Sequence, residues 1–359
     1  MKNYVKYFSI LLALFFAISS CTKKTTPAPS ESSSYGLTTT FAGSLSYGYV
    51  NGKDTTARFS GPSSVDVDQA GNIYVADAGN QDIRKITPSG IVTTIAGSGQ
   101  MGAANGLGTA ASFTYPYGIA VDINGNIYVA DAGNNLIRKI TPDGMVSTLA
   151  GSGAKGSQDG PGTSATFNFP YGIAVDVAGN VYVADASNNT VRKITVAGIV
   201  STLAGDGTVG AKNGNGVSAS FNYPQDLDID GSGNIYVADE ANHLIRKITP
   251  SGVVTTFAGT GIKGSDDGPV TTATFNYPDS ITHDADGNIY VSDEGSSLIR
   301  KITPAGMVST LAGNGSFGFA NGIGKAAVFN EIFGIAIDKS NNLFVADLGN
   351  YMIRKVIAK

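Results

Sequence analysis

The side chains best suited to chemistry are acidic residues in two short stretches of the sequence and aromatic residues at matching positions elsewhere. Carboxylates close together can bind a cation or a cationic group, and aromatic rings can pack against a cation or a flat apolar face. We therefore expect a ligand-binding site rather than a site of covalent chemistry. Its candidate residues are Tyr117, Tyr171, Asp226, Asp228, Glu240, Asp279, Glu294 and Phe333.

A metal-dependent enzyme, a hydrolase or lyase similar to lactonases, is the alternative. Carboxylates and imidazole rings bind divalent cations, and the alternative metal ligands are Asp226, Asp228, Asp279 and His283. The sequence has only two histidines, too few for a three-histidine zinc site. It also has no nucleophile elbow and no Ser-His-Asp order. We therefore assign no catalytic residue and no cofactor, and keep a divalent cation in the centre of the molecule as the alternative.

A repeat of 54 residues determines where these side chains lie. Its marks are a proline in each unit, replaced by isoleucine in the sixth, and a phenylalanine three residues earlier: Pro62, Pro116, Pro170, Pro224, Pro278 and Ile332, and Phe59, Phe113, Phe167, Phe221, Phe275 and Phe329. Within a unit, turn residues separate short apolar runs, which predicts four strands over 116–122, 125–131, 137–141 and 145–151. Such an antiparallel sheet buries both faces only by stacking against its copies, which predicts a β-propeller.

The two ends of the chain indicate a closed ring. Residues 332–357 supply only three strands of the sixth unit, whereas residues 38–43 (TTTFAG) match the fourth strand of the first unit at 92–97 (VTTIAG). We expect this N-terminal strand to complete the last blade, because closure leaves no exposed sheet edge. The predicted fold is all-β, a six-bladed propeller of four-stranded antiparallel blades over residues 37–359.

The repeated blocks resemble NHL repeats. In the second unit the resemblance rests on the run from Pro116 to Asp122, on Tyr128-Val-Ala-Asp131 and on Ile137-Arg-Lys139. It extends over residues 37–359, and the chain is similar to secreted bacterial NHL-repeat lipoproteins. The resemblance implies a six-bladed propeller. The unit is lengthened by a glycine-rich connection of about eighteen residues between blades, for example 151–169.

An aspartate and an arginine recur in every unit and face each other across one hairpin. The pairs are Asp77 and Arg84, Asp131 and Arg138, Asp185 and Arg192, Asp239 and Arg246, Asp293 and Arg300, and Asp347 and Arg354. Catalysis needs one site, so a sixfold set indicates a structural role. We expect the carboxylates to accept hydrogen bonds from turn amides and to pair with the guanidinium groups.

Positions that differ among the units are where a ligand site can arise. Strands alternate in direction, so the start of the first strand and the end of the second lie at the same end of the propeller. We expect the eight candidate residues to surround one mouth of the central channel. The acids of units four and five form one side, and the aromatic residues of units two, three and six form the other. Such a mouth is suited to a small ligand, a saccharide or a peptide.

The N-terminus has the features of an exported lipoprotein. An apolar run over residues 7–18 follows two lysines and leads to Cys21, the only cysteine in the chain. This pattern resembles a bacterial lipobox and predicts a signal peptide over residues 1–20 and acylation of Cys21. An ordinary signal peptide with a chance cysteine is the alternative. Residues 21–36 comprise this cysteine and a segment rich in Ser, Thr and Pro, which predicts a flexible tether.

The expected partners follow from the anchor and from the charge. Acylated Cys21 places the protein on a lipid bilayer in the bacterial cell envelope, at the outer membrane with the propeller on its periplasmic or surface face. The formal net charge is −4, and a negative, exported protein does not have the basic surface of a nucleic-acid-binding protein. We therefore expect a lipid-anchored binding scaffold whose partners are the bilayer and a small ligand or a protein.

Overall fold

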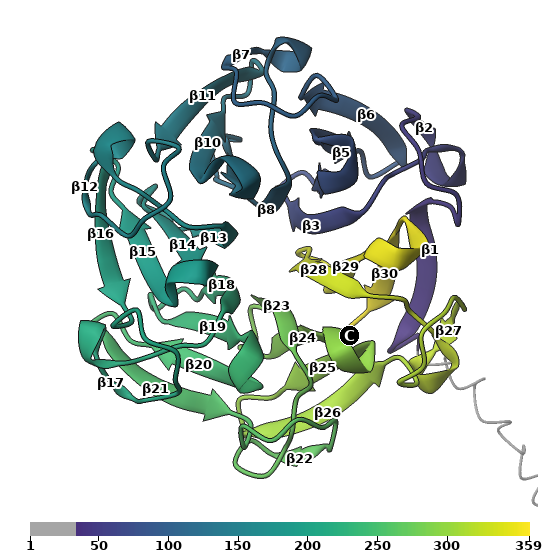
Figure 1. Cartoon of the computed structure of the whole chain (residues 1–359). Coiled ribbons are helices and arrows are strands. Elements are labelled where there is room, and N and C mark those ends of the chain that lie inside the picture. The colour runs from purple at the N-terminus through teal and green to yellow at the C-terminus, as the bar shows by residue number, and fades with distance from the viewer. Residues whose placement is uncertain (1–33) are drawn as a thin grey trace, which may run out of the picture. The chain divides into compact units, whose positions relative to one another are not determined.

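A computed structural model describes residues 34–359, which form a ring of six β-sheets around a central axis (Figure 1). The predicted signal peptide, Cys21 and most of the tether lie outside the described residues. Among the residues described, no helix has the length and apolarity needed to cross a membrane. The expectation of an all-β, six-bladed propeller is confirmed.

Each blade contains the predicted antiparallel meander of four strands. The innermost strands, which line the axis, are β3 (Pro62–Val67), β8 (Pro116–Val121), β13 (Pro170–Val175), β18 (Pro224–Ile229), β23 (Pro278–His283) and β28 (Ile332–Ile337). The second strands are β4 (Ile73–Asp77), β9 (Ile127–Asp131), β14 (Val181–Asp185), β19 (Ile235–Asp239), β24 (Ile289–Asp293) and β29 (Asn342–Asp347). The third strands are β5 (Asp82–Ile86), β10 (Leu136–Ile140), β15 (Thr190–Ile194), β20 (Leu244–Ile248), β25 (Leu298–Ile302) and β30 (Met352–Ile357). The fourth strands are β6 (Ile91–Ala96), β11 (Met145–Ala150), β16 (Ile199–Ala204), β21 (Val253–Ala258), β26 (Met307–Ala312) and β1 (Leu37–Gly43).

The prediction of four strands in each blade is corrected, because every sheet has a fifth. These two-residue strands are β2 (Gly52–Lys53), β7 (Gly106–Leu107), β12 (Gly160–Pro161), β17 (Gly214–Asn215), β22 (Gly268–Pro269) and β27 (Gly322–Ile323). They come from the glycine-rich connections, which fold back along the fourth strand of the same blade, as Gly106 does against Val146. The connection thereby covers an outer sheet edge that would otherwise be free to pair with another chain.

Short 3-10 turns join several of the strands. One group follows the second strands: η2 (Ala78–Asn80), η4 (Ala132–Asn134), η6 (Ala186–Asn188), η8 (Glu240–Asn242), η9 (Glu294–Ser296) and η11 (Leu348–Asn350). A second group lies in the connections: η1 (Asp54–Thr56), η3 (Gly108–Ala110), η5 (Gly162–Ser164), η7 (Gly216–Ser218) and η10 (Gly324–Ala326).

The ring closes as predicted. Strand β1 pairs antiparallel with β30, with Thr38 opposite Val356 and Gly43 opposite Met352. In Figure 1 the first strand of the chain therefore lies beside the last, within one sheet. Blade six contains strands from both ends of the described chain, β1 and β28 to β30. All six blades of the described ring therefore have the four strands of the meander.

The apolar core lies between the faces of neighbouring blades. The second strands are buried along their whole length, as in β9, except for the first residue of β29, because both of their faces pack against another sheet. Each interface has its own apolar cluster: Tyr128 and Ala130 of blade two, for example, pack with Val183 and Phe167 at blade three. Burying apolar surface in this way stabilises the stack at roughly 25 cal/mol per Å².

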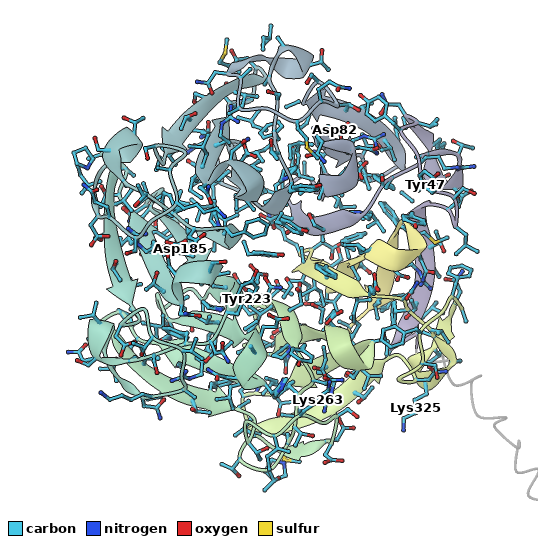
Figure 2. All side chains as sticks on the ribbon, viewed as in Figure 1. Tyr47, Asp82, Asp185, Tyr223, Lys263 and Lys325 are labelled. Carbon is cyan, nitrogen blue, oxygen red and sulfur yellow. The ribbon has the colours of Figure 1, made fainter. Side chains whose placement is uncertain are left out.

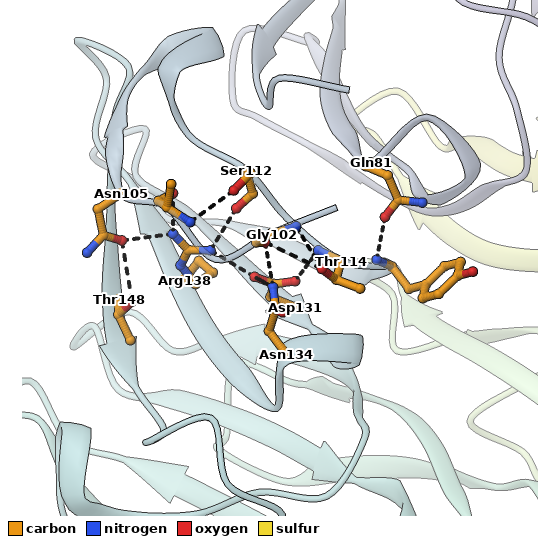
Figure 3. A network of polar contacts seen from close by, with 11 residues as sticks. Gln81, Gly102, Asn105, Ser112, Thr114, Asp131, Asn134, Arg138 and Thr148 are labelled. Atoms are coloured by element: carbon orange, nitrogen blue, oxygen red, sulfur yellow. Dashed lines mark hydrogen bonds and ion pairs between the residues drawn. The ribbon is translucent and has the colours of Figure 1, made fainter. Parts of the chain in front are cut away.

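The sixfold aspartate and arginine pairs form a buried polar girdle, as the sequence indicates. In blade two the Arg138 Nη1 donates to Asp131 Oδ2 at 2.8 Å, and Nη2 donates to Asn105 Oδ1 at 2.8 Å (Figure 3). The Asp131 Oδ1 accepts a hydrogen bond from the Thr114 amide at 2.7 Å. All six arginines are fully buried, and each pairs with its aspartate. The girdle ties the third strand of each blade to the glycine-rich connection.

Candidate ligand-binding site at the channel mouth

The inner strands bring one variable residue from each blade to the same end of the channel. Every inner strand starts at this end, and its second residue is Ser63, Tyr117, Tyr171, Gln225, Asp279 or Phe333. The strands approach closely because small residues follow. A Cβ atom on Gly172 would lie 2.3 Å from Asp226 Oδ1, and one on Gly118 would lie 2.1 Å from the Tyr171 carbonyl oxygen. Glycine is therefore required where blades two and three meet their neighbours.

Four aromatic rings of blades two to four form a continuous surface at this mouth, which we call the aromatic platform: Tyr117, Phe169, Tyr171 and Tyr223. Tyr117 and Tyr171 are stacked, with ring centroids 4.4 Å apart. Phe169 and Tyr223 flank Tyr171 at 5.5 and 5.9 Å. Figure 2 shows Tyr223 close to the axis of the ring. The platform offers flat apolar faces of the kind expected from the sequence.

The sequence analysis missed two members of the aromatic platform. Phe169 and Tyr223 directly precede the prolines that start β13 and β18, and both have a positive φ, 55° and 57°. Their backbone amides donate to Asn135 Oδ1 and Asn189 Oδ1 at 3.0 and 2.9 Å, which fixes this conformation. A signal was available, because the residue before the strand proline is aromatic in four units: Tyr115, Phe169, Tyr223 and Tyr277.

Phe333 occupies the equivalent place in blade six but is not part of the platform. It is the second residue of β28 and is partly buried. Among the aromatic pairs of residues 34–359, none joins Phe333 to another ring. The aromatic side of the mouth is therefore built from blades two, three and four rather than two, three and six.

Acidic residues of blades four and five lie beside the platform. Asp279 is 7% exposed, and burial together with Glu240, Asp226 and Glu294 raises its pKa well above the usual range. Glu240 and Glu294 begin the turns η8 and η9, and burial with repulsion from Glu294 raises the pKa of Glu240 to about 7. No hydrogen bond or ion pair to the Asp279 carboxyl group occurs within residues 34–359.

Asp226 is the third residue of β18, one position further from the mouth than Asp279 in β23. Its carboxyl group already accepts hydrogen bonds from the protein. Its Oδ2 accepts hydrogen bonds from the Ser280 hydroxyl at 2.5 Å and from the Ile281 amide at 3.3 Å. These bonds link blade four to blade five. Burial raises the pKa of Asp226 to about 7 in spite of them. Asp226 thus contributes charge to the mouth but has little capacity left for direct contact with a ligand.

The structure does not bring Asp228 to the mouth. Residues along a strand are separated by about 3.3 Å each, so Asp228 lies roughly 7 Å further along the channel than Asp226. There its Oδ2 pairs with Nδ1 of His283 at 2.5 Å, and this hydrogen bond raises the pKa of His283. Asp66, which the sequence did not suggest, also lines this deeper part of the channel, and burial raises its pKa to about 7.

The alternative metal ligands do not converge on one point. Asp279 is the second residue of β23 and His283 the sixth, a separation of roughly 13 Å along an extended strand. Asp226 and Asp228 lie between these levels on β18. Within residues 34–359, no three His, Cys, Asp or Glu side chains are arranged to hold a metal ion. The residues present therefore do not fit a single divalent cation.

Family models and curated relatives support the repeat assignment. A model described as NHL repeat matches residues 59–86, 167–194 and 221–248, and one described as Teneurin NHL domain matches residues 101–161. Protein SUPPRESSOR OF QUENCHING 1, chloroplastic, of Arabidopsis thaliana is 32% identical over 284 residues, which cover 74% of this chain and 27% of that protein. NHL repeat-containing protein 2 of Bos taurus is 29% identical over 337 residues, 82% of this chain and 46% of that protein. The chain thus spans less than half the length of these relatives.

A solved structure supports the fold. The crystal structure of an auxiliary nutrient binding protein from Bacteroides thetaiotaomicron matches with a TM-score of 0.68 and 17% identity, covering 89% of this chain and 76% of that one. At this identity the likeness concerns the architecture. The repeats in the sequence, the six sheets and the closed ring all agree with it. The chain is an NHL-repeat six-bladed β-propeller.

Proposed function

We propose that this protein is a lipid-anchored binding scaffold of the bacterial cell envelope, and that the mouth of its channel binds a small ligand, a saccharide or a peptide. The observation that carries the proposal is the aromatic platform beside the unpaired carboxyl group of Asp279. Stacked rings next to a buried acid provide a flat apolar contact and a polar group that fixes orientation, the usual composition of a small-ligand site.

The contrast between repeated and unrepeated residues supports a ligand at this mouth. The repeated polar residues of the girdle are held by partners within their own blade. At the mouth, the Asp279 carboxyl group and Gln225 Oε1 have no hydrogen-bond partner within residues 34–359. An auxiliary nutrient binding protein shares the architecture, which is compatible with a scaffold that binds and does not convert its ligand.

The direct test is a screen of saccharides and short peptides against the purified protein by calorimetry. We expect Tyr171→Ala to weaken binding of any ligand found by at least tenfold, because Tyr171 contacts all three other rings of the platform. Tyr47→Ala is the matched control, since Tyr47 is 73% exposed at the rim of the ring (Figure 2). Equal loss of binding in both variants contradicts a site at the mouth.

The lipid anchor is tested separately. When the full chain is expressed in a bacterium fed an alkyne fatty acid, we expect the wild type to be labelled and to fractionate with membranes. Cys21→Ser should abolish both properties and leave the propeller folded. Labelling that persists in the variant contradicts acylation of Cys21.

The alternative, a metal-dependent hydrolase or lyase, has weaker support, because its four ligands lie at different levels of the channel. Elemental analysis of the purified protein distinguishes the two functions. A tightly held divalent ion in stoichiometric amount favours the enzyme, and a protein that binds its ligand after chelation favours the scaffold.

A further inference from the structure

We infer that the ligand carries a primary ammonium group, which enters a small pocket under the aromatic platform and contacts Asp279 and Gln225. This inference rests on the proposed function and narrows it to a chemical class. It is carried by three properties of the pocket: its unpaired acceptors, its size and its cluster of acidic groups without an ion-pair partner.

The acceptors belong to two different strands. Gln225 of β18 and Asp279 of β23 both line the pocket and are each 7% exposed. The Gln225 Oε1 is buried and has no hydrogen-bond partner within the described residues. A buried acceptor without a donor destabilises the folded protein, so a ligand that donates hydrogen bonds here removes this penalty. An ammonium group has three donors and no acceptor.

The inner part of the pocket is suited to a small cationic group. Its volume of about 20 Å³ is about the space that one water molecule needs. A primary ammonium is similar in size to water, whereas a trimethylammonium or a guanidinium group is larger. The stacked rings of Tyr117 and Tyr171 line the same pocket, so the rest of the ligand lies against the platform.

The pocket is surrounded by acidic groups that form no ion pair within the described residues. Asp226, Glu240 and Glu294 surround Asp279 from β18, η8 and η9, and Tyr117 approaches from β8. Within residues 34–359, no lysine, arginine or histidine forms an ion pair with any of these four carboxyl groups. Lys263 opposes the rise in the pKa of Glu294, and its ammonium group lies over the ring of Tyr277 at 4.7 Å from the centroid.

Binding of an ammonium group should release a proton. Burial and the neighbouring carboxylates raise the pKa of Asp279, which favours the protonated carboxyl group in the free site. A cation in contact favours the ionised carboxylate. The carboxyl proton then leaves to solvent as the amine binds, and the ion pair forms between the ligand ammonium and the carboxylate.

Two matched pairs of probes test the inference by calorimetry, and they also separate the possible sources of the amine. A trimer of glucosamine is compared with its fully N-acetylated form, and Nα-acetyl-lysine amide is compared with its Nε-acetyl derivative. We expect the amine member of at least one pair to bind at least tenfold more tightly than its acetylated partner. An acetylated probe that binds as well as its amine overturns the inference and leaves the proposed function intact. If neither amine binds at millimolar concentration, the inference is overturned as well.

Variants locate the contact. Asp279→Asn keeps the size of the side chain and should weaken the amine probe at least tenfold while leaving thermal stability unchanged or higher. Asp143→Asn, an exposed turn acid, is the matched control. Gln225→Met provides a second variant that should weaken the same probe.

Proton release provides a readout that a merely structural role of Asp279 would not change. At pH 6, the binding enthalpy of the amine should depend on the ionisation enthalpy of the buffer in the wild type and much less in Asp279→Asn. Equal dependence in the two proteins overturns the assignment of Asp279 as the contact.

Discussion

The buried girdle and the channel mouth use the same residue types for different purposes. In the girdle, six carboxylates each pair with a fully buried arginine, and every blade repeats the arrangement. At the mouth, the equivalent positions of six blades hold different residues, and the carboxyl group of Asp279 has no hydrogen-bond partner within residues 34–359. The comparison indicates that repetition with paired carboxylates supports architecture, although the Nε of each girdle arginine is buried without a partner within residues 34–359, whereas variation with an unpaired carboxyl group supports binding.

The largest expected effect is on the girdle. Arg138→Met removes a guanidinium that is bonded to Asp131, Asn105 and two carbonyl groups. We expect a loss of about 3–5 kcal/mol in the free energy of unfolding, because the Asp131 carboxylate stays buried without its partner. Urea unfolding measures this loss. If Asp279→Asn costs as much as Arg138→Met, the distinction between the two regions does not hold.

A smaller effect is expected where inner strands meet. Gly172→Ala places a methyl group 2.3 Å from Asp226 Oδ1, and relieving this overlap should cost about 1–3 kcal/mol. Gly231→Ala is the control, because a Cβ atom there meets nothing within 4 Å. Thermal unfolding of both variants compares them. Equal melting temperatures would contradict close packing of the inner strands at the mouth.

The dependence of stability on pH should reflect the carboxyl groups of the channel. Asp66 and Asp226 have a folded-state pKa of about 7, whereas unfolded aspartates titrate near 4. The folded state therefore holds protons that the unfolded state has lost, so the free energy of unfolding falls as pH rises from about 4 to about 7. Asp226→Asn should reduce this fall, by on the order of 1–2 kcal/mol. Urea unfolding at several pH values measures it, and an unchanged slope contradicts the burial of a proton at Asp226.

The smallest effect is expected at the rim of the mouth. Glu240→Gln removes repulsion between Glu240 and Glu294 and should raise the free energy of unfolding at pH 7 by less than about 1 kcal/mol. The gain should shrink as pH falls below about 7 and disappear below about 4, where Glu240 is protonated in both the folded and the unfolded state. A clear loss of stability instead would show that Glu240 has a structural partner and belongs with the girdle.

The fold was predictable because its signals are repeated and local. The period of 54 residues, the turn glycines and the match between residues 38–43 and 92–97 each specify one part of the ring. The fifth strand was not predictable from the same pattern. Two residues such as Gly106 and Leu107 have no alternation to recognise, and their pairing with β11 depends on how the connection bends.

The candidate site was only partly predictable. Position within the repeat correctly places Tyr117, Tyr171 and Asp279 at one mouth. Position within the repeat does not show how far along the channel a side chain lies. The sequence therefore placed Asp228 at the mouth, whereas in the structure it pairs with His283 further along the channel. Phe169 and Tyr223 were missed because their rings reach the mouth through a left-handed backbone conformation before proline. The spacing of residues along a strand does not predict where a positive φ turns the backbone before the strand begins.

The pairing of β1 with β30 also has a consequence for synthesis. Thr38 is among the first described residues to be made, and its partner Val356 is among the last. Contacts between distant parts of a chain slow folding, and here the last blade cannot form until β30 has been made. Until then β1 is an unpaired strand that can associate with other chains. A cell that makes this protein must therefore keep the first strand apart from other strands until its partner emerges.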